Sequence, residues 1–350
     1  MADTVATKID IENAVKHILD SIDREREREV IVRRFGINDK KETLEQVGES
    51  MGITRERVRQ IEKATLIRVK ISLENSKDSN CIAVEKEIIK ALHEMGRAAR
   101  VDDLTIKLMG DSSVKSRAAV ILLAELSSKM VVTTENDRYH QAVVLSDVDD
   151  DKLIKDATDA IMNAIKKHGE PLTLDELHKV VNGYEHPNEV AAMASISKQI
   201  ANLHGKWGLT KWPTVNPKNI RDKIFVVMTA HGKPMHFSDI AKAIKAQNFK
   251  RNDVTQQAIH NELIKDDRFI LVGRGIYALD TWGYKRGSIT DIITDILKQE
   301  SPLHREEIVR RVLKARQVRE ATVLLNLQNK PQFKRVAKAQ YALNPESEKK

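Results

Sequence analysis

The chain has 350 residues, and its 59 Lys or Arg against 51 Asp or Glu give a formal net charge of +8. A single cysteine, Cys81, excludes a disulfide framework, and the longest uncharged apolar run, 118–124, is too short to span a membrane. Only 4% of the residues are aromatic and only 14 are Gly. Because sandwiches and barrels need more aromatic strand residues and turn glycines, the composition favours a mainly α fold in several domains.

The positive charge is concentrated at the C-terminal end. Residues 1–70 hold 15 basic and 14 acidic side chains, whereas residues 285–350 hold 15 basic and 8 acidic ones. Basic segments attract polyanions, because neutralising phosphates releases counterions. The charge therefore favours a polyanion partner, but it leaves DNA, RNA and a role in solubility open.

Apolar spacing and end signals predict helices in the first 70 residues. Apolar residues recur at helical intervals between Ile9 and Ile22, and the next helix is expected to end at Gly36. Thr43 can cap a short helix that ends at Gly52, and residue 54, a threonine, can cap a further helix.

This last helix separates its side chains by face. Val58, Ile61 and Thr65 fall on one side. The opposite side is polar and consists of Arg55, Glu56, Arg59, Gln60 and Lys63. A short helix, a glycine turn and a second helix with such an outer face form the layout of a major-groove reader, since Arg, Gln and Glu can pair with guanine, adenine and cytosine. The alternative to a major-groove reader is a helix face that is only exposed to solvent, with side-chain pairs such as Glu56 with Gln60.

The stretch REREVIVRRFGINDKKETLEQVGESMGITRERVRQIEKATLIRVK resembles region 4 of the sigma-70 family of bacterial sigma factors. The resemblance covers roughly residues 9–70, within an expected domain 1–72, and depends on the RFGI, TLEQVG and TRERVRQIE elements. It implies a domain that binds the minus-35 promoter element and the flap of the RNA polymerase β subunit. It also implies base reading by Arg55, Glu56, Arg59 and Gln60, and phosphate contacts or neutralisation by Thr43, Arg57 and Lys63.

The aromatic content separates the chain from a complete sigma factor. Such a factor also melts the minus-10 element, and flipped bases need aromatic platforms on which to stack. Residues 1–84 contain one aromatic residue, Phe35, and it lies inside the stretch that resembles region 4. We therefore do not expect promoter melting.

Four later segments share one frame: 84–146, 152–218, 219–284 and 287–345, the first being the most divergent. IRDKIFVVMTAHGKPMHFSDIAKAI, from Ile220, aligns with SITDIITDILKQESPLHREEIVRRV, from Ser288. Each segment is predicted to form three helices and a hairpin, clearest in RFILVGRGIYAL, where Gly273-Arg274-Gly275 is the turn. We expect tandem winged helices with separate small cores, and a linker at the acidic run 147–151.

The third segment, with GKPMHFSDIAKAI and DDRFILVGRGIYALDTWGY, resembles the HARE-HTH domain. The fourth, with SPLHREEIVRRV and QYAL, is similar to a shorter version of it. Modules of this family occur in the δ subunit of bacterial RNA polymerase and in chromatin and restriction proteins. The resemblance implies contact with nucleic acid or polymerase and no chemistry of the module's own.

Individual side chains in these segments suggest binding more than catalysis. Arg274, at a wing turn, can enter a minor groove. His236 and His304 follow equivalent prolines, which indicates a capping or packing role. No metal-ligand spacing, nucleophile-base pair, carboxylate pair or P-loop is found, so we expect no enzyme, no cofactor and no metal.

Basic residues of the last segment predict a phosphate-tracking patch. Between 285 and 340, 13 basic residues oppose 6 acidic ones. The patch consists of Arg305, Arg310, Arg311, Lys314, Arg316 and Arg319, with Lys330, Lys334, Arg335 and Lys338 near the wing. Arg310, Arg311 and Lys314 are its candidate DNA contacts.

Together, these patterns predict a sigma-related transcription factor that binds double-stranded DNA. Residues 54–63 would recognise a minus-35-like element, the domain would associate with the RNA polymerase core, and the winged helices would add DNA or polymerase contacts. Two alternatives stay open: a polymerase-docking regulator of inhibitor or phage type without sequence-specific reading, and an accessory DNA-binding subunit of a restriction or defence system. We expect a cytoplasmic, nucleoid-associated protein with no membrane contact, in an oligomeric state that the sequence leaves open.

Overall fold

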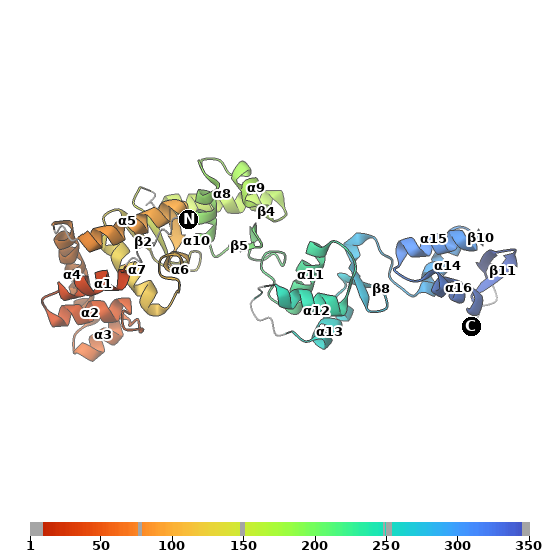
Figure 1. Ribbon diagram of the computed structural model, residues 1–350, viewed down its shortest axis with the longest axis horizontal. Helices are drawn as coiled ribbons and strands as arrows, with labels where there is room; N and C mark the ends of the chain where they lie inside the picture. Colours follow the sequence, from red (N-terminus) through yellow and green to blue (C-terminus); the bar gives the residue numbers. More distant parts are fainter. Residues whose placement is uncertain (1–9, 76–78, 148–150, 248, 250–253, 345–350) are drawn as a thin grey trace, which may run out of the picture. The chain divides into compact units, whose positions relative to one another are not determined.

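The computed structural model describes residues 10–75, 79–147, 151–247, 249 and 254–344 (Figure 1). The chain divides into two compact units, residues 1–211 and 212–350. Most described residues lie in helices, and the strands form four small antiparallel sheets of three strands each. The mainly α composition predicted from the sequence is therefore confirmed.

The first unit begins with four helices: α1 Ile11–Asp20, α2 Glu25–Phe35, α3 Leu44–Met51 and α4 Arg55–Asn75. Their ends follow local chemistry. Gly36 and Gly52 adopt left-handed conformations, with φ of 84° and 65°, as the C-caps of α2 and α3. The Thr43 hydroxyl accepts from the backbone N–H of Gln46, whose side chain accepts from the Thr43 N–H in return. A Cβ at Gly48 would lie 2.7 Å from the carbonyl oxygen of Ile53, so glycine allows the turn to pass close to α3.

Two segments of equal topology complete the first unit, and two more form the second. Repeat 1 contains α5 Ser79–Glu94, β1 Ala98–Arg100, α6 Val101–Met109, α7 Val114–Leu126, β2 Met130–Thr133 and β3 Ala142–Leu145. Repeat 2 contains α8 Asp151–His168, β4 Leu172–Thr173, α9 Leu174–Val180, α10 Pro187–Ile196, β5 Ile200–Leu203 and β6 Lys206–Leu209. Cys81, in α5, is thus helical.

In the second unit, repeat 3 contains α11 Ile220–His231, β7 Met235–His236, α12 Phe237–Ala246, α13 Gln256–Lys265, β8 Phe269–Gly273, β9 Ile276–Leu279 and the 3₁₀ turn η1 Asp280–Trp282. Repeat 4 contains α14 Ile289–Gln299, β10 Leu303–His304, α15 Arg305–Ala315, α16 Glu320–Asn329, β11 Phe333–Ala337 and β12 Gln340–Leu343. In every repeat the strand after the first helix pairs with the last strand, giving the sheet orders β1-β3-β2, β4-β6-β5, β7-β9-β8 and β10-β12-β11.

The N-terminal helices and repeat 1 share one hydrophobic core. Ile11 and Ile18 of α1 and Val69 of α4 belong to the same buried cluster as Leu92 and Leu122 of repeat 1. A smaller cluster of three buried valines, Val30, Val47 and Val58, holds α2, α3 and α4 together. Each repeat was expected to have a small core of its own. For repeat 1 this expectation is wrong, because the apolar side of α1 is buried against α5 and α7.

Repeat 1 also packs on repeat 2. A Cβ at Gly96 would overlap the backbone of Asn188 in α10, at 2.2 Å from its carbonyl oxygen, and Tyr139 forms an isolated bridge with Ser197. Of the expected linker, residues 148–150 lie outside the described chain, Asp147 pairs with Arg97, and Asp151 begins α8. Repeat 4 keeps a hydrophobic core of its own.

Candidate nucleic-acid interface

The first turns of α4 present a polar face to solvent. The Thr54 hydroxyl accepts from the backbone N–H of Arg57 at 3.2 Å and so caps the helix. Val58 is fully buried against the valines of α2 and α3, which fixes the rotation of α4 about its axis. The residues on the opposite side are all exposed, as predicted: Arg55, Glu56, Arg59, Gln60 and Lys63.

Several of these exposed side chains pair with neighbours. Arg59 Nε and Nη2 donate to the two carboxylate oxygens of Glu56 at 2.9 and 2.6 Å, one helical turn away. These hydrogen bonds lower the pKa of Glu56 and raise that of Arg59. Arg55 lies 2.8 Å from Glu45 of α3. Because exposed ion pairs contribute little to stability, the paired groups can exchange their partners for DNA at small cost.

Two candidate phosphate contacts in this domain carry no ion pair among the described residues. Lys63 is exposed on α4, and Arg57 donates only a 3.3 Å hydrogen bond to Gln60. Thr43 is exposed as well, and its hydroxyl oxygen already accepts the capping hydrogen bond. Its O–H proton remains available to a phosphate oxygen.

Arginines of α2 hold α4 in place, a role that the sequence patterns did not reveal. Arg34 Nε donates to Glu62 of α4 at 2.9 Å, and its Nη1 donates to the Glu42 carbonyl oxygen at 2.6 Å. Arg33 donates to the Ser50 hydroxyl of α3 at 2.7 Å. These side chains join α2 to both helices of the helix-turn-helix, α3 and α4. The two arginines of the RRFG sequence therefore fix the position of the candidate interface from within the domain.

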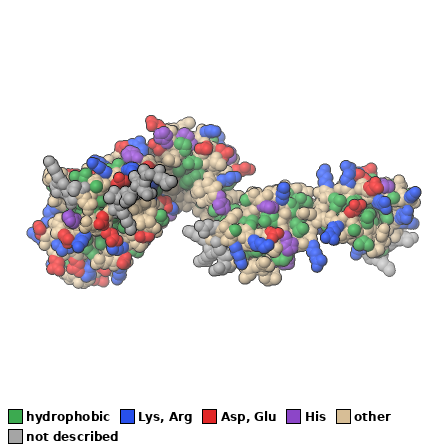
Figure 2. Space-filling model, in the orientation of Figure 1, with side chains coloured by type: hydrophobic (Ala, Val, Ile, Leu, Met, Phe, Trp, Pro, Cys, Tyr) green, Lys and Arg blue, Asp and Glu red, His purple; other side chains and the backbone are tan. Residues whose placement is uncertain are grey.

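Figure 2 shows Lys and Arg side chains on the visible face of repeat 4. Some of the cations of this repeat form ion pairs, and others form none among the described residues. Arg310 and Arg311 both bind Glu307, at 2.7 and 2.6 Å, and Arg311 also binds Glu300 at 2.7 Å. Their hydrogen bonds lower the pKa of Glu307 to about 2. Lys314 is exposed and forms no ion pair among the described residues.

Arg316 does not belong to the expected basic patch. Its side chain is buried, at 8% exposure, and donates to the Leu271 carbonyl oxygen of repeat 3. Burial lowers its pKa, because removal from water disfavours the charged form. A guanidinium used in this way cannot reach a phosphate.

The other singled-out residues of the second unit have clear places. Arg274 is exposed at the turn between β8 and β9. His236 and His304 cap α12 and α15, and their Nδ1 atoms accept from the backbone N–H groups of Ser238 and Glu306 at 3.3 and 3.4 Å. The capping role predicted for both histidines is confirmed.

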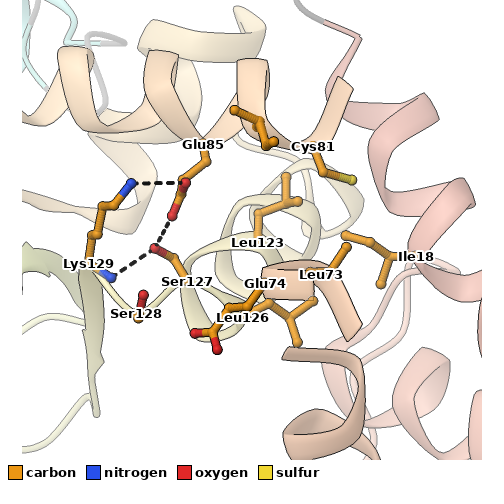
Figure 3. Close-up of a pocket in the computed structure, with 11 residues that line it drawn as sticks. Ile18, Leu73, Glu74, Cys81, Glu85, Leu123, Leu126, Ser127, Ser128 and Lys129 are labelled. Atoms are coloured by element: carbon orange, nitrogen blue, oxygen red, sulfur yellow. Dashed lines mark hydrogen bonds and ion pairs between the residues drawn. The ribbon is translucent and has the colours of Figure 1, made fainter. Parts of the chain in front are cut away.

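A pocket of about 340 Å³ lies where α1, α4, α5 and α7 meet (Figure 3). Its apolar wall includes Leu73, Cys81 and Leu123. At its rim, Glu85 accepts from the Ser127 hydroxyl at 2.6 Å and from Lys129 Nζ at 3.4 Å. These polar groups form hydrogen bonds with one another, so the pocket offers a ligand mainly apolar contacts. Within the described parts of the chain, no cluster of three His, Cys, Asp or Glu could hold a metal, and no helix could cross a membrane.

Comparison with known proteins identifies the N-terminal domain. Residues 24–70 match the family Sigma-70, region 4. RNA polymerase sigma factor RpoS of Coxiella burnetii is 43% identical over 67 residues, which are 19% of this chain and 19% of the relative. Sigma factor SigA of a Bacillus species is 40% identical over 70 residues, 20% of this chain and 18% of the relative, and the sigma-28 factor of Bacillus thuringiensis is 38% identical over 68 residues, 19% and 28%.

The candidate interface thus lies in a domain related to sigma-70 region 4. The chain spans less than a third of the length of these relatives, and the similarity covers about a fifth of the chain, all of it near the N-terminus.

Proposed function

We propose that the protein is a DNA-binding transcription factor related to sigma factors, and that α4 recognises a minus-35-like promoter element. The observation that carries this proposal is the exposed face of α4, which presents Arg, Glu and Gln side chains at the start of the second helix of the helix-turn-helix, within the residues that match region 4. A helix of this composition suits the major groove. The proposed mechanism is binding, with no catalytic step.

The proposal gives each side chain of the interface a role. The base-reading residues are Arg55, Glu56, Arg59 and Gln60, and the phosphate-contacting residues are Thr43, Arg57 and Lys63. In this scheme Arg59 exchanges its ion pair with Glu56 for the O6 and N7 atoms of a guanine, while Glu56 becomes free to accept from a cytosine amino group.

The four repeats are proposed to be winged helices that extend the contact along DNA or along RNA polymerase. Their common sheet order supports this assignment, and repeats 3 and 4 carry the HARE-HTH-like sequences. Arg274 and Lys314 are proposed phosphate contacts, because both are exposed and neither forms an ion pair among the described residues. Arg310 and Arg311 are left out because they form a network with Glu300 and Glu307, in which two carboxylates neutralise the two guanidinium groups. Arg59, by contrast, forms an ion pair with Glu56 alone among the described residues.

The relatives are RNA polymerase sigma factors by name, which supports association of this protein with the polymerase core through the β flap. A polymerase-docking regulator that does not read sequence is the second candidate. It is favoured by Ile67 and Ile71, which lie one turn apart on α4 and are 49% and 52% exposed. Such an apolar pair suits a protein partner better than a phosphate backbone.

Selection of binding sites from random duplex DNA tests the proposal with the full-length protein. The wild type should enrich one short element, and Arg59→Ala should lose about 5- to 150-fold in preference at one base pair while it keeps salt-sensitive non-specific binding. Arg24→Ala is the matched control, because Arg24 forms the same i,i+3 ion pair, with Glu27, outside α4. Equal enrichment by wild type and Arg59→Ala contradicts base reading, and polymerase co-purification without any enrichment favours the docking regulator.

A further inference from the structure

The hairpins of repeats 3 and 4 align residue by residue. FILVGRGIYAL, residues 269–279, matches FKRVAKAQYAL, residues 333–343, in length and in the position of the bulge. Both have a two-residue turn, Arg274-Gly275 in one and Lys338-Ala339 in the other. Equivalent positions in the two hairpins can therefore be compared directly.

The outer side of the repeat 3 hairpin is covered by protein. Ile270 and Val272 are 3% and 0% exposed, and they pack with Trp282 and Tyr284. The edge of β8 that does not pair with β9 is covered too, because the backbone N–H of Gln317 donates to the Val272 carbonyl oxygen at 3.0 Å. This hairpin is an internal connection between repeats 3 and 4, with Arg274 alone as a cation at its turn.

The repeat 4 hairpin is open at the same positions. Lys334 stands where repeat 3 has Ile270, and Val336, which is 50% exposed, stands where repeat 3 has Val272. Every β11 residue after Phe333 is exposed. The hairpin therefore projects from its core with both faces of β11 available.

The charge of this open hairpin is of one sign. Lys330, Lys334, Arg335 and Lys338 are exposed, and none forms an ion pair among the described residues. The sequence from 321 to 344 contains no Asp or Glu. By contrast, the helix that precedes the hairpin, α16, has Glu320 as its single charged residue and a 54% exposed Leu325 near its centre.

The hairpins of the first unit are less suited to a polyanion. The β2–β3 connection of repeat 1 contains Glu135 and Asp137, and Glu135 binds Lys198 of repeat 2 at 2.7 Å. The β5–β6 hairpin of repeat 2 contains one lysine, Lys206. Of the four hairpins, the last combines the most cations with the most accessible surface.

We propose that the β11–β12 hairpin is a second DNA contact, which binds the phosphates of duplex DNA without reading their sequence. In this proposal the hairpin makes the contact of repeat 4, and α16, which carries no cation, does not. From Lys334 to Lys338 a strand extends about 13 Å, and duplex DNA presents one charge per about 1.7 Å of its axis, so the hairpin meets several phosphates at once. The choice of DNA as the polyanion rests on the proposed function. Exposed lysines can also protect a free sheet edge from aggregation, and the test separates the two roles.

The test measures the affinity of the full-length protein for a 30-base-pair duplex of arbitrary sequence as a function of KCl concentration, by fluorescence anisotropy. The hairpin variant is Lys334→Gln/Arg335→Gln/Lys338→Gln. The control, Arg286→Gln/Arg310→Gln/Arg311→Gln, removes the same charge from three ion-paired arginines of the second unit. The slope of log K against log [salt] should fall by about 2–3 in the hairpin variant, about 0.9 for each lost phosphate contact, and by less than about 1 in the control.

Equal slopes for the hairpin variant and the wild type, or equal falls in both variants, overturn the proposal. Aggregation of the hairpin variant with an unchanged slope assigns the lysines to edge protection instead. Should the triple variant not fold, mass-spectrometric acetylation of the wild type gives the answer, since DNA should protect Lys334 and Lys338 more than Lys90 of repeat 1. The sequence preference measured with Arg59→Ala is independent of this slope, so a failure of base reading and a failure of the hairpin proposal are distinguishable.

Discussion

The shared core of the N-terminal helices and repeat 1 makes a prediction for Ile18→Ala. Ile18 of α1 is 2% exposed and packs in the cluster that includes α5 and α7. Removal of a buried Ile side chain to Ala costs about 2–5 kcal/mol. Ile18 also lines the apolar pocket, where the neighbouring side chains have room to close in. We therefore expect a loss at the lower end, about 2–3 kcal/mol.

Calorimetry and hydrogen exchange measure this loss. For a unit of this size, a loss of 1 kcal/mol lowers Tm by about 2–4 °C, so the expected shift is about 4–12 °C. Exchange should quicken together at amides of α1, α4 and α7, because these helices share one core. Ile71→Ala, at a 52% exposed position of α4, is the control and should change stability by less than about 0.5 kcal/mol. Faster exchange confined to α1–α4, with repeat 1 unaffected, would refute the shared core.

Three further substitutions test other parts of the structure. Thr43→Ala removes the N-cap hydroxyl of α3 and should lower the free energy of unfolding by about 0.5–2 kcal/mol in urea titrations; no change would mean that the cap is dispensable. Gly273→Ala places a Cβ 2.7 Å from the Gln317 carbonyl oxygen and should speed hydrogen exchange at the Gln317 amide, whereas unchanged protection would show that the contact adjusts. The hydrogen bonds from Arg268 lower the pKa of Asp266, so their stabilisation is present above the unfolded pKa of about 3.9 and is lost as the pH falls through the lower folded pKa. Asp266→Asn should make stability less dependent on pH below about 5, and an unaltered acid profile would contradict this account.

The features that the sequence predicted best are those that depend on residues close together in the chain. Gly36 and Gly52 end their helices and Thr43 begins one, because a cap depends on groups within a single turn. The stripe on α1 correctly predicted a buried face. It could not identify the helix that covers this face, since periodicity carries no information about the opposing surface. The partner, α7, lies about a hundred residues further along the chain.

The same distinction holds for the candidate interfaces. The exposed face of α4 follows from helical geometry, and the ion pairs of Glu307 with Arg310 and Arg311 lie at i+3 and i+4, where spacing could have revealed them. Arg316 could not have been separated from the basic patch in this way. Its partner, the Leu271 carbonyl oxygen, belongs to another repeat.

Site-specific photocrosslinking from position 60 tests the central claim most directly. Gln60 is exposed on the outer face of α4, so a photoreactive amino acid can replace it without disturbing the core. The full-length protein is irradiated in the presence of both promoter DNA and RNA polymerase. Our account predicts a crosslink to the DNA that disappears when excess unlabelled duplex carrying the selected element is added. A crosslink to a polymerase subunit that DNA does not compete away would contradict it.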